Sequence, residues 1–292
     1  MTDTNTLNTA WMRAVQVRRR LPRPPVLVVI CVAILVLIIG SAALAPFIAP
    51  YNPDAQNLGN ANAAPSAANV LGTDSFGRDI LSRLLFAGGT SLSAALLAVS
   101  IAAAIGVVSG LIAGYVGGVV DSLMSRWVDV MLSLPGLIFV FAVIGIIGPG
   151  LTGAMITFGV LMSPTFYRVV RSSAADFRNR TFVLAARSIG ARQSRILRVH
   201  IFPNTLSPMI VQLTLGMGMA IGGEASLSFL GLGAQIPQSS WGSMVRQAFD
   251  AIYVNSWQLV PPATILILTI LCLSIVGDAI TDSFARKGGL RS

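Results

Sequence analysis

Residues 26–48 read VLVVICVAILVLIIGSAALAPFI, an apolar run without a single charged side chain. An α-helix needs about 20 mostly apolar residues to cross the hydrocarbon core of a bilayer. Five arginines lie upstream, at positions 13, 18, 19, 20 and 23, as they would before a signal peptide. The run is too long for that assignment, because the apolar core of a signal peptide spans about 7–15 residues. It therefore predicts an uncleaved first transmembrane helix over residues 26–48.

The composition of the chain extends this prediction to the whole molecule. Of 292 residues, 54% are hydrophobic and 11% are charged, whereas soluble domains carry about 25% charged residues. So few charges do not cover a water-facing surface, and most of the surface is expected to contact lipid. The net charge of +9 does not indicate nucleic-acid binding, because the basic residues lie between apolar runs and not on one polar face.

Gaps between charged residues locate the next three spans. No charge falls between Arg83 and Asp121, which leaves room for a second helix, and none falls between Asp129 and Arg168. The sequence over residues 148–150 is Gly-Pro-Gly, and these residue types interrupt helices. The second gap therefore predicts a third and a fourth helix, separated by this tripeptide.

Two further spans follow a polar stretch. The fifth is expected over residues 207–232 and contains Glu224. The sixth is expected to start at Pro261-Pro262, because proline in a first helical turn removes no required donor, and to end near Asp278. The sequence thus predicts an all-α membrane protein with six transmembrane helices.

The distribution of basic residues orients these helices. With six spans both termini lie on one side, and 17 of the 20 basic residues fall in the two tails, the loop over residues 122–127 and the loop between the fourth and fifth helices. The positive-inside rule places that side in the cytoplasm. The expected segments are a cytoplasmic tail over 1–25, the helix 26–48, an extracytoplasmic segment 49–86, a five-helix core 87–282 with a cytoplasmic loop 171–205 and an extracytoplasmic loop 233–260, and a cytoplasmic tail 283–292.

The two extracytoplasmic segments are long enough to hold structure of their own. Residues 49–86 end in a stretch that predicts a short amphipathic helix, in which Asp79 and Arg83 form an i,i+4 ion pair. Residues 233–260 carry aromatic rings with a polar edge, which favour the membrane interface. A short helix is expected to lie at the outer surface or to dip into it. The aromatic residues are Trp241, Tyr253 and Trp257.

Small residues recur at a helical spacing of four. Such a stripe lets another helix backbone approach closely, so it predicts close helix packing. A moving gate surface remains the alternative interpretation. The positions are Gly106, Gly110, Gly114 and Gly118 in the second helix and Gly218 and Gly222 in the fifth.

The sequence lacks the residues that a zinc site or a P-loop would need. Cys31, Cys272 and the single histidine, His200, are too few for a four-ligand zinc site, and the cysteines are interpreted as small buried apolar residues. A P-loop needs a lysine after its glycines, but the only lysine, Lys287, follows no such loop. The chain is therefore not expected to be an enzyme, to bind ATP in that way or to hold a metal.

Glu224 is the one acidic residue well inside an apolar run. Ionisable side chains there are costly and are functional candidates by default. The alternative is a structural carboxylate near the outer end of its helix. The sequence leaves both interpretations open.

The polar loop over residues 171–205 carries the clearest pattern. Phe182, Val183, Ala186 and Ile189 fall at helical spacing, and Gly190 allows the left-handed conformation that ends a helix. A second short helix is expected to follow and to stop at a proline, Pro203, before the fifth span. A helix, a turn and a helix at the cytoplasm suit a groove on a partner protein. The alternative is a basic loop that only fixes topology.

This loop resembles the coupling loop of bacterial ABC importer permeases. The family signature is Glu-Ala-Ala, a glycine after three further residues, and a later Ile-x-Pro. The glutamate position is Leu184 here, so the resemblance implies no ion pair from that position to an ATPase. The matching residues are Ala185, Ala186, Gly190, Ile201 and Pro203.

The resemblance extends over most of residues 26–282. Residues 71–79, LGTDSFGRD, look like the outer segment of the C-type subunit of the dipeptide, oligopeptide and nickel permeases. Residues 226–233, SLSFLGLG, followed by Ser-Trp-Gly at 240–242, are similar to another stretch of that subunit, and Gly-Asp at 277–278 also fits.

What the resemblance implies is a subunit of a larger assembly in a bacterial inner membrane. A homologous permease subunit would complete a translocation pathway, two ATPase domains would bind ATP and Mg²⁺ and contact the coupling loop, and a solute-binding protein would deliver short peptides. Nickel or another small solute is the alternative cargo. A stand-alone secondary carrier and a scaffold whose arginines bind anionic lipid or nucleic acid are the competing classes.

Overall fold

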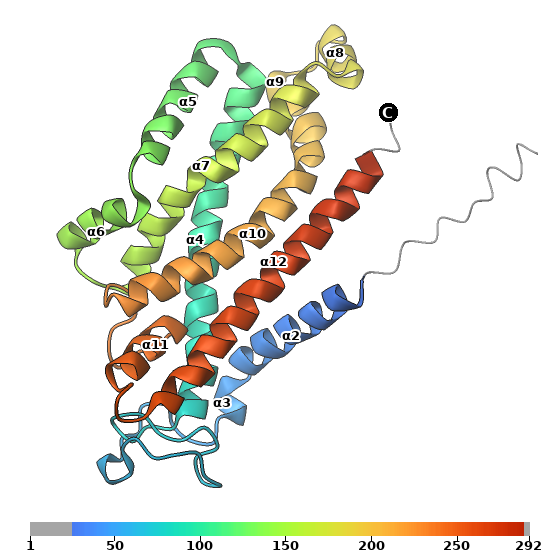
Figure 1. Ribbon diagram of the computed structural model, residues 1–292. Helices are drawn as coiled ribbons and strands as arrows, with labels where there is room; N and C mark the ends of the chain where they lie inside the picture. Colours follow the sequence, from blue (N-terminus) through green and yellow to red (C-terminus); the bar gives the residue numbers. More distant parts are fainter. Residues whose placement is uncertain (1–24, 289–292) are drawn as a thin grey trace, which may run out of the picture.

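The computed structural model describes residues 25–288, so the predicted tails lie wholly or partly outside it. Within that range every long element is an α-helix, and the long helices run side by side in one bundle (Figure 1). The helices are α2 (Val26–Ala43), α3 (Ala45–Ile48), α4 (Ile80–Val116), α5 (Gly118–Ser133), α6 (Gly136–Ile147), α7 (Leu151–Arg178), α8 (Thr181–Ser188), α9 (Gln193–Arg195), α10 (Phe202–Phe229), α11 (Trp241–Asp250) and α12 (Val260–Gly288).

The described residues contain five candidate spans, or six if one bent helix pair is counted as a single span. Five helices are long and apolar enough to cross a membrane: α2, α4, α7, α12, and α10 together with the turns before it from Gln193. The sixth candidate is the pair α5 and α6, which is bent by 88° at a short break. Figure 1 shows α8 and the end of α12 at one end of the bundle, and α11 and the segment before α4 at the opposite end.

The third span differs from the straight helix expected between Asp129 and residue 148. Residues 122–127, expected as a loop, lie inside α5. Proline has no backbone N–H and forces the preceding residue into an extended conformation, and Leu134 before Pro135 has φ −79° and ψ 133°. The local effect of this one proline overrides the apolar run and divides the span into two helices.

The glycine repeat of α4 forms the closest helix contact of the bundle. A Cβ added at Gly106 would lie 2.5 Å from the carbonyl oxygen of Ser163, and one at Gly110 would lie 2.8 Å from that of Tyr167. Gly114 meets the carbonyl oxygen of Arg171 at 2.4 Å in the same way. Both helix backbones therefore touch, and the predicted close packing is confirmed for α4 against α7.

The other predicted glycines do not share this role. Gly118 lies beyond the end of α4, with φ +61° and open space where a Cβ would be. On α10, a Cβ at Gly218 or Gly222 would meet the nearest atom of α12 at 3.9 Å and 3.8 Å, which is ordinary contact. Spacing alone did not separate tight from loose seams, because the tightness depends on what faces each glycine.

The first and last spans pack together at Cys31 and Cys272. Their side chains are 4% and 2% exposed and lie in one apolar cluster, as small buried residues. Helix α12 begins at Val260 with both prolines in its first turn, as predicted, but it extends to Gly288 instead of ending near residue 278.

The segment between the first two spans also differs from expectation. The predicted amphipathic helix does not form as a separate element, because α4 itself begins at Ile80 and thus inside the predicted extracytoplasmic segment. Asp79 caps that helix: its carboxylate accepts hydrogen bonds from the backbone N–H and the hydroxyl of Ser82, at 2.8 Å and 2.7 Å. The predicted Asp79–Arg83 ion pair is therefore wrong, since the cap uses the carboxylate.

Candidate functional site

The polar connection between α7 and α10 is shorter than residues 171–205. Helix α7 continues to Arg178, and after α8 the chain turns and is helical again from Gln193 onward. Gly190 has φ +76°, while the N–H groups of Gly190 and Ala191 donate to the carbonyls of Arg187 and Ala186 at 3.0 Å and 3.1 Å. This pair of bonds is a Schellman motif. The predicted order of helix, turn and helix is confirmed.

Helix α8 is anchored by one face and free on the other. Val183 is fully buried and Ala186 is 6% exposed, both in a cluster with α4, α7 and the turns before α10. Leu184 is 48% exposed, and Ala185 is exposed beside it. Helix α8 is therefore fixed to the bundle by its buried face, while Leu184 and Ala185 remain accessible on its exposed face.

The predicted Ile201 and Pro203 lie where the chain re-enters the bundle. Residues Ile196–Ile201 form a π-helix that continues directly into α10, so Pro203 does not stop a helix as expected. It occupies the first turn of α10 and is exposed. The wider π-helical turn ahead of it removes the conflict that a proline ring makes with a regular α-helix. Ile201 is fully buried under α8.

Polar contacts of Arg187 and Tyr115 connect α8 to α4. The Arg187 guanidinium lies 5.1 Å from the centre of the Tyr115 ring on α4, a cation–π geometry. The Tyr115 hydroxyl donates a hydrogen bond to the Gln193 side chain, beyond the turn. Movement of α8 is thereby linked to α4, whose glycine seam links it in turn to α7.

Glu224 lies at the opposite end of the bundle and is fully buried. One carboxylate oxygen accepts from the Ser91 hydroxyl on α4 at 2.9 Å, and the other from the Ser228 hydroxyl at 2.6 Å. Each hydroxyl in turn accepts a backbone N–H, from Trp241 at 3.0 Å and from Ala234 at 3.1 Å. The carboxylate therefore ties α4, α10 and the start of α11 together.

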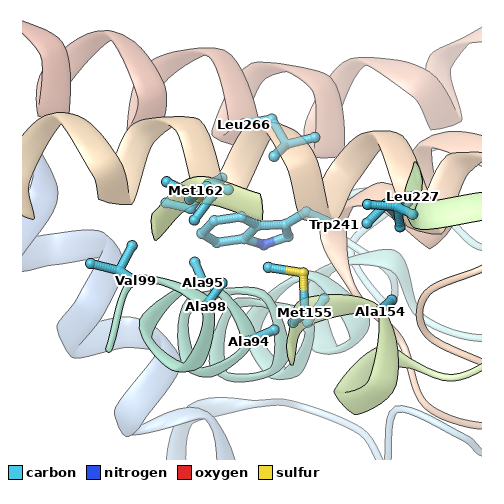
Figure 2. Packing of buried hydrophobic residues seen from close by; sticks show 14 of the residues in the cluster. Ala94, Ala95, Ala98, Val99, Ala154, Met155, Met162, Leu227, Trp241 and Leu266 are labelled. Atoms are coloured by element: carbon cyan, nitrogen blue, oxygen red, sulfur yellow. The ribbon is translucent and has the colours of Figure 1, made fainter. Parts of the chain in front are cut away.

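Trp241 was expected at the membrane interface, and that prediction is wrong. Its side chain is 1% exposed and its indole N–H donates to the carbonyl of Leu84 on α4 at 3.2 Å. Figure 2 shows the ring within the main apolar cluster, together with Met155, Leu227 and Leu266. Helix α11 thus dips into the end of the bundle opposite α8 and inserts Trp241 as a plug between helices.

Two arginines are buried beside α11. Arg78 and Arg83 are 2% and 1% exposed, and both contact the carboxylate of Asp74, at 2.7 Å and 3.5 Å. Gln247 of α11 accepts from both guanidinium groups, at 2.9 Å and 3.4 Å. The cluster fixes α11 to the start of α4, and it is a structural polar network on this geometry.

A charged ladder that the sequence reasoning missed joins α5 to α7. Asp121 and Asp129 on α5 pair with Arg171, at 2.6 Å, and Arg168, at 2.9 Å, and between them the Ser125 hydroxyl lies 3.0 Å from that of Tyr167. The signal was available, because the three α5 positions are four residues apart and share one helix face. It was hidden by assigning residues 122–127 to a loop.

No group of three or more histidine, cysteine, aspartate or glutamate side chains is placed to hold a metal within residues 25–288. These arrangements can transmit movement rather than catalyse a reaction. Helix α8 is anchored at one end of the bundle, Trp241 of α11 is inserted at the other, and the closely packed α4–α7 pair lies between them.

Comparison with known proteins gives this arrangement a family. Residues 106–288 match the binding-protein-dependent transport system inner membrane component, a span that includes α8 and the turn at Gly190. The chain belongs to this family. Residues 16–65 match the N-terminal transmembrane domain of oligopeptide transport permease C, so the resemblance drawn from the sequence motifs is confirmed.

Relatives with assigned roles match over most of this permease. The dipeptide transport system permease protein DppC of Alkalihalophilus pseudofirmus is 38% identical over 246 residues, which are 84% of this chain and 81% of that protein. The glutathione transport system permease protein GsiD of Shigella flexneri serotype 5b is 41% identical over 255 residues, or 86% and 84% of the two chains. The Escherichia coli O157:H7 GsiD protein is 39% identical.

The fold has a solved counterpart. Inward-facing structures of the MetNI methionine ABC transporter superimpose with a TM-score of 0.56 at 19% identity, over 70% of this chain and 96% of that one. The chain is a permease subunit of an ABC importer and a multi-pass protein of the inner membrane. The roles of Leu184, Ala185, Ala186, Gly190, Ile201, Pro203 and Glu224 stay predictions.

Proposed function

We propose that this permease forms half of the translocation pathway of an importer for short peptides, and that α8 receives the movement of an ATPase. The relatives named for dipeptide and glutathione transport support a short peptide as cargo. The observation that carries the coupling role is the division of α8, with Val183 and Ala186 anchored and Leu184 and Ala185 free. A rigid lever with one free face suits a groove on a partner.

The assembly would contain a homologous permease subunit, two ATPase domains that bind ATP and Mg²⁺, and a solute-binding protein. This chain would act as a non-catalytic membrane subunit, with hydrolysis in the ATPases. Exposed apolar residues on the α5–α6 span support its facing lipid or a second permease; they include Val119 at 74%, Leu123 at 64% and Ile146 at 86% exposed.

The orientation follows from the even number of spans and the arginine-rich α8 end. Both termini and α8 would face the cytoplasm, and α11 would face the solute-binding protein. Alternating access would arise from rigid-body movement of packed helices, driven at α8 and closed at the outer end by Trp241 and its neighbours.

A stand-alone carrier is less well supported. A proton-coupled carrier needs an acid that changes partners during the cycle, whereas both oxygens of Glu224 are hydrogen-bonded and the side chain has no exposed surface. The structure therefore favours a tie between helices for this residue.

Thiol labelling tests the docking of α8. Ala185→Cys places a reactive thiol on the free face, and Ala67→Cys, exposed in the outer segment, is the matched control. The native Cys31 and Cys272 are buried and give little background. Both variants should react with maleimide in the isolated permease, and only Ala185→Cys should be protected when the ATPases are co-purified.

Equal labelling of Ala185→Cys with and without bound ATPases would overturn the assignment of α8. The cargo is tested separately, by ATP-dependent uptake of labelled dipeptides into vesicles that hold the complete transporter. Uptake of nickel or another small solute in place of peptides would show that the proposed cargo is wrong. It would not affect the proposed docking of α8 on an ATPase.

A further inference from the structure

A cavity of about 400 Å³ lies beside α8, between the ends of α4 and α7 and the turns before α10. Its walls come from the last turns of α4, the end of α7, α8, and the turns at Gln193–Leu197. The volume falls in the range of small-molecule sites, about 300–1,000 Å³. The cavity is partly open to the surface and lies where α8 contacts the end of α4.

Two arginines from different helices line this cavity, Arg178 of α7 and Arg187 of α8, and no acidic side chain does. Neither forms an ion pair with any residue that the structure describes. The Nε of Arg187 is buried without a hydrogen-bond partner. A buried charged donor without an acceptor is costly, so an acceptor oxygen bound at the Nε of Arg187 would stabilise this arrangement.

Both guanidinium groups are held in place by their surroundings. Arg187 stacks on the Tyr115 ring. Arg178 passes over Gly117, whose φ is +70°, and a Cβ there would lie 2.2 Å from a guanidinium nitrogen of Arg178. Arginine offers its donors in a planar fork that matches the oxygens of a phosphate. The guanidinium groups of Arg178 and Arg187 thus offer hydrogen-bond donors for a phosphate group.

The remaining wall of the cavity is apolar. Ile112 and Val116 belong to the spanning helix α4 and are 36% and 51% exposed, and Leu197 also lines the cavity. A soluble anion gains nothing from such a surface, whereas an acyl chain does. The cavity therefore crosses from a charged zone to a lipid-facing zone, which is the division that a phospholipid has.

We propose that this cavity binds an anionic phospholipid of the cytoplasmic leaflet, with its phosphate between Arg178 and Arg187 and its chains along Ile112 and Val116. The choice of leaflet rests on the orientation proposed above. Basic pockets between spanning helices on that side suit anionic headgroups. A bound lipid would join α4, α7 and α8 and so stiffen the lever through which the ATPase acts.

Native mass spectrometry of the purified full-length chain tests this site with phosphatidylglycerol and phosphatidylcholine as probes. The chain should retain phosphatidylglycerol in preference to phosphatidylcholine. In the double variant Arg178→Gln/Arg187→Gln the affinity for phosphatidylglycerol should fall by about tenfold or more, since each arginine near an anionic headgroup contributes to affinity. Arg180→Gln/Arg192→Gln, two exposed arginines outside the cavity, is the charge-matched control and should bind normally.

Equal binding by the cavity variant and the wild type would overturn the proposal. Displacement of the lipid by inorganic phosphate alone would also overturn it and identify a soluble anion as the ligand. Arg178→Gln alone keeps the Arg187–Tyr115 contact, so it tests the site if the double variant does not fold, and Arg187→Lys should retain part of the binding. Only the permease is present, so a failure of ATPase docking does not affect the result.

Discussion

The Ser91 hydroxyl on α4 donates a 2.9 Å hydrogen bond to the carboxylate of Glu224 on α10, 133 residues away in the sequence. Ser91 also accepts the backbone N–H of Trp241, the first residue of α11. One carboxylate thereby fixes the depth at which the Trp241 plug enters the bundle. Of the two interpretations of Glu224 that the sequence left open, this contact favours the structural one.

Glu224→Ala should lower the thermal stability of the permease in detergent, because the hydroxyls of Ser91 and Ser228 lose their buried acceptor. Each unsatisfied group costs about 1–3 kcal/mol. Glu224→Gln retains acceptor oxygen and should lose much less stability, with uptake by the complete transporter keeping its pH profile. A pH profile that shifts in Glu224→Gln would instead make this residue part of the transport chemistry.

Gly110→Ala should destabilise the α4–α7 pair, because the new Cβ would lie 2.8 Å from the carbonyl oxygen of Tyr167. Overpacking of this kind costs about 1–3 kcal/mol. Gly222→Ala is the matched control on α10: its Cβ has room, and alanine is favoured over glycine in a helix by about 0.8–1.0 kcal/mol. The measurement is the melting temperature of each purified variant. Similar melting temperatures for both variants would contradict the assigned α4–α7 seam.

Gly190→Val should abolish ATP-dependent uptake while leaving the spanning helices folded. At Gly190 the φ of +76° is the constraint, since nothing lies within 4 Å of an added Cβ, and a β-branched residue is strongly disfavoured there. Gly190→Asn is the control, because asparagine tolerates the left-handed region. Uptake in proteoliposomes should be near normal for the asparagine variant. Normal uptake by the valine variant would show that coupling does not need this turn.

Asp74→Asn should be far more damaging than Asp129→Asn. The first leaves Arg78 buried without an anionic partner and Arg83 with only Asp54, 3.9 Å away, and removing one partner of a buried ion pair costs about 3–5 kcal/mol. The second breaks an ion pair whose side chains are 59% and 65% exposed, which is worth about 0–1 kcal/mol. Thermal unfolding of the two variants checks the difference. If both lose equal stability, the cluster of Asp74, Arg78 and Arg83 does not hold α11 in place.

Much of the fold was accessible from the sequence because lipid imposes one rule on every span. A backbone in hydrocarbon must satisfy its own hydrogen bonds, so long charge-free runs had to be helices, and the six expected spans agree with the five or six candidates in the structure. The Schellman turn at Gly190 and the proline start of α12 followed from local backbone chemistry. Such features depend only on a few residues that are neighbours in the sequence, so they can be predicted from the sequence alone.

The errors have a common physical origin in contacts between distant segments. Asp79 was paired with Arg83 by spacing, but in the fold Asp79 caps α4 while Arg83 turns to Asp74 and Gln247. Trp241 was assigned to the membrane interface, although its ring is buried against α4. Residue type alone does not decide between two partners when both are chemically suitable.

The sequence by itself determined a six-span inner membrane permease of the ABC importer family, with the motif residues from Leu184 to Pro203 in one connection. Only the tertiary structure decided which face of α8 is anchored, which glycines touch another backbone, and that Arg178 and Arg187 line one cavity. Helix formation in a membrane is satisfied within each segment, whereas burial, pairing and cavities depend on the segments that pack together from far apart in the chain.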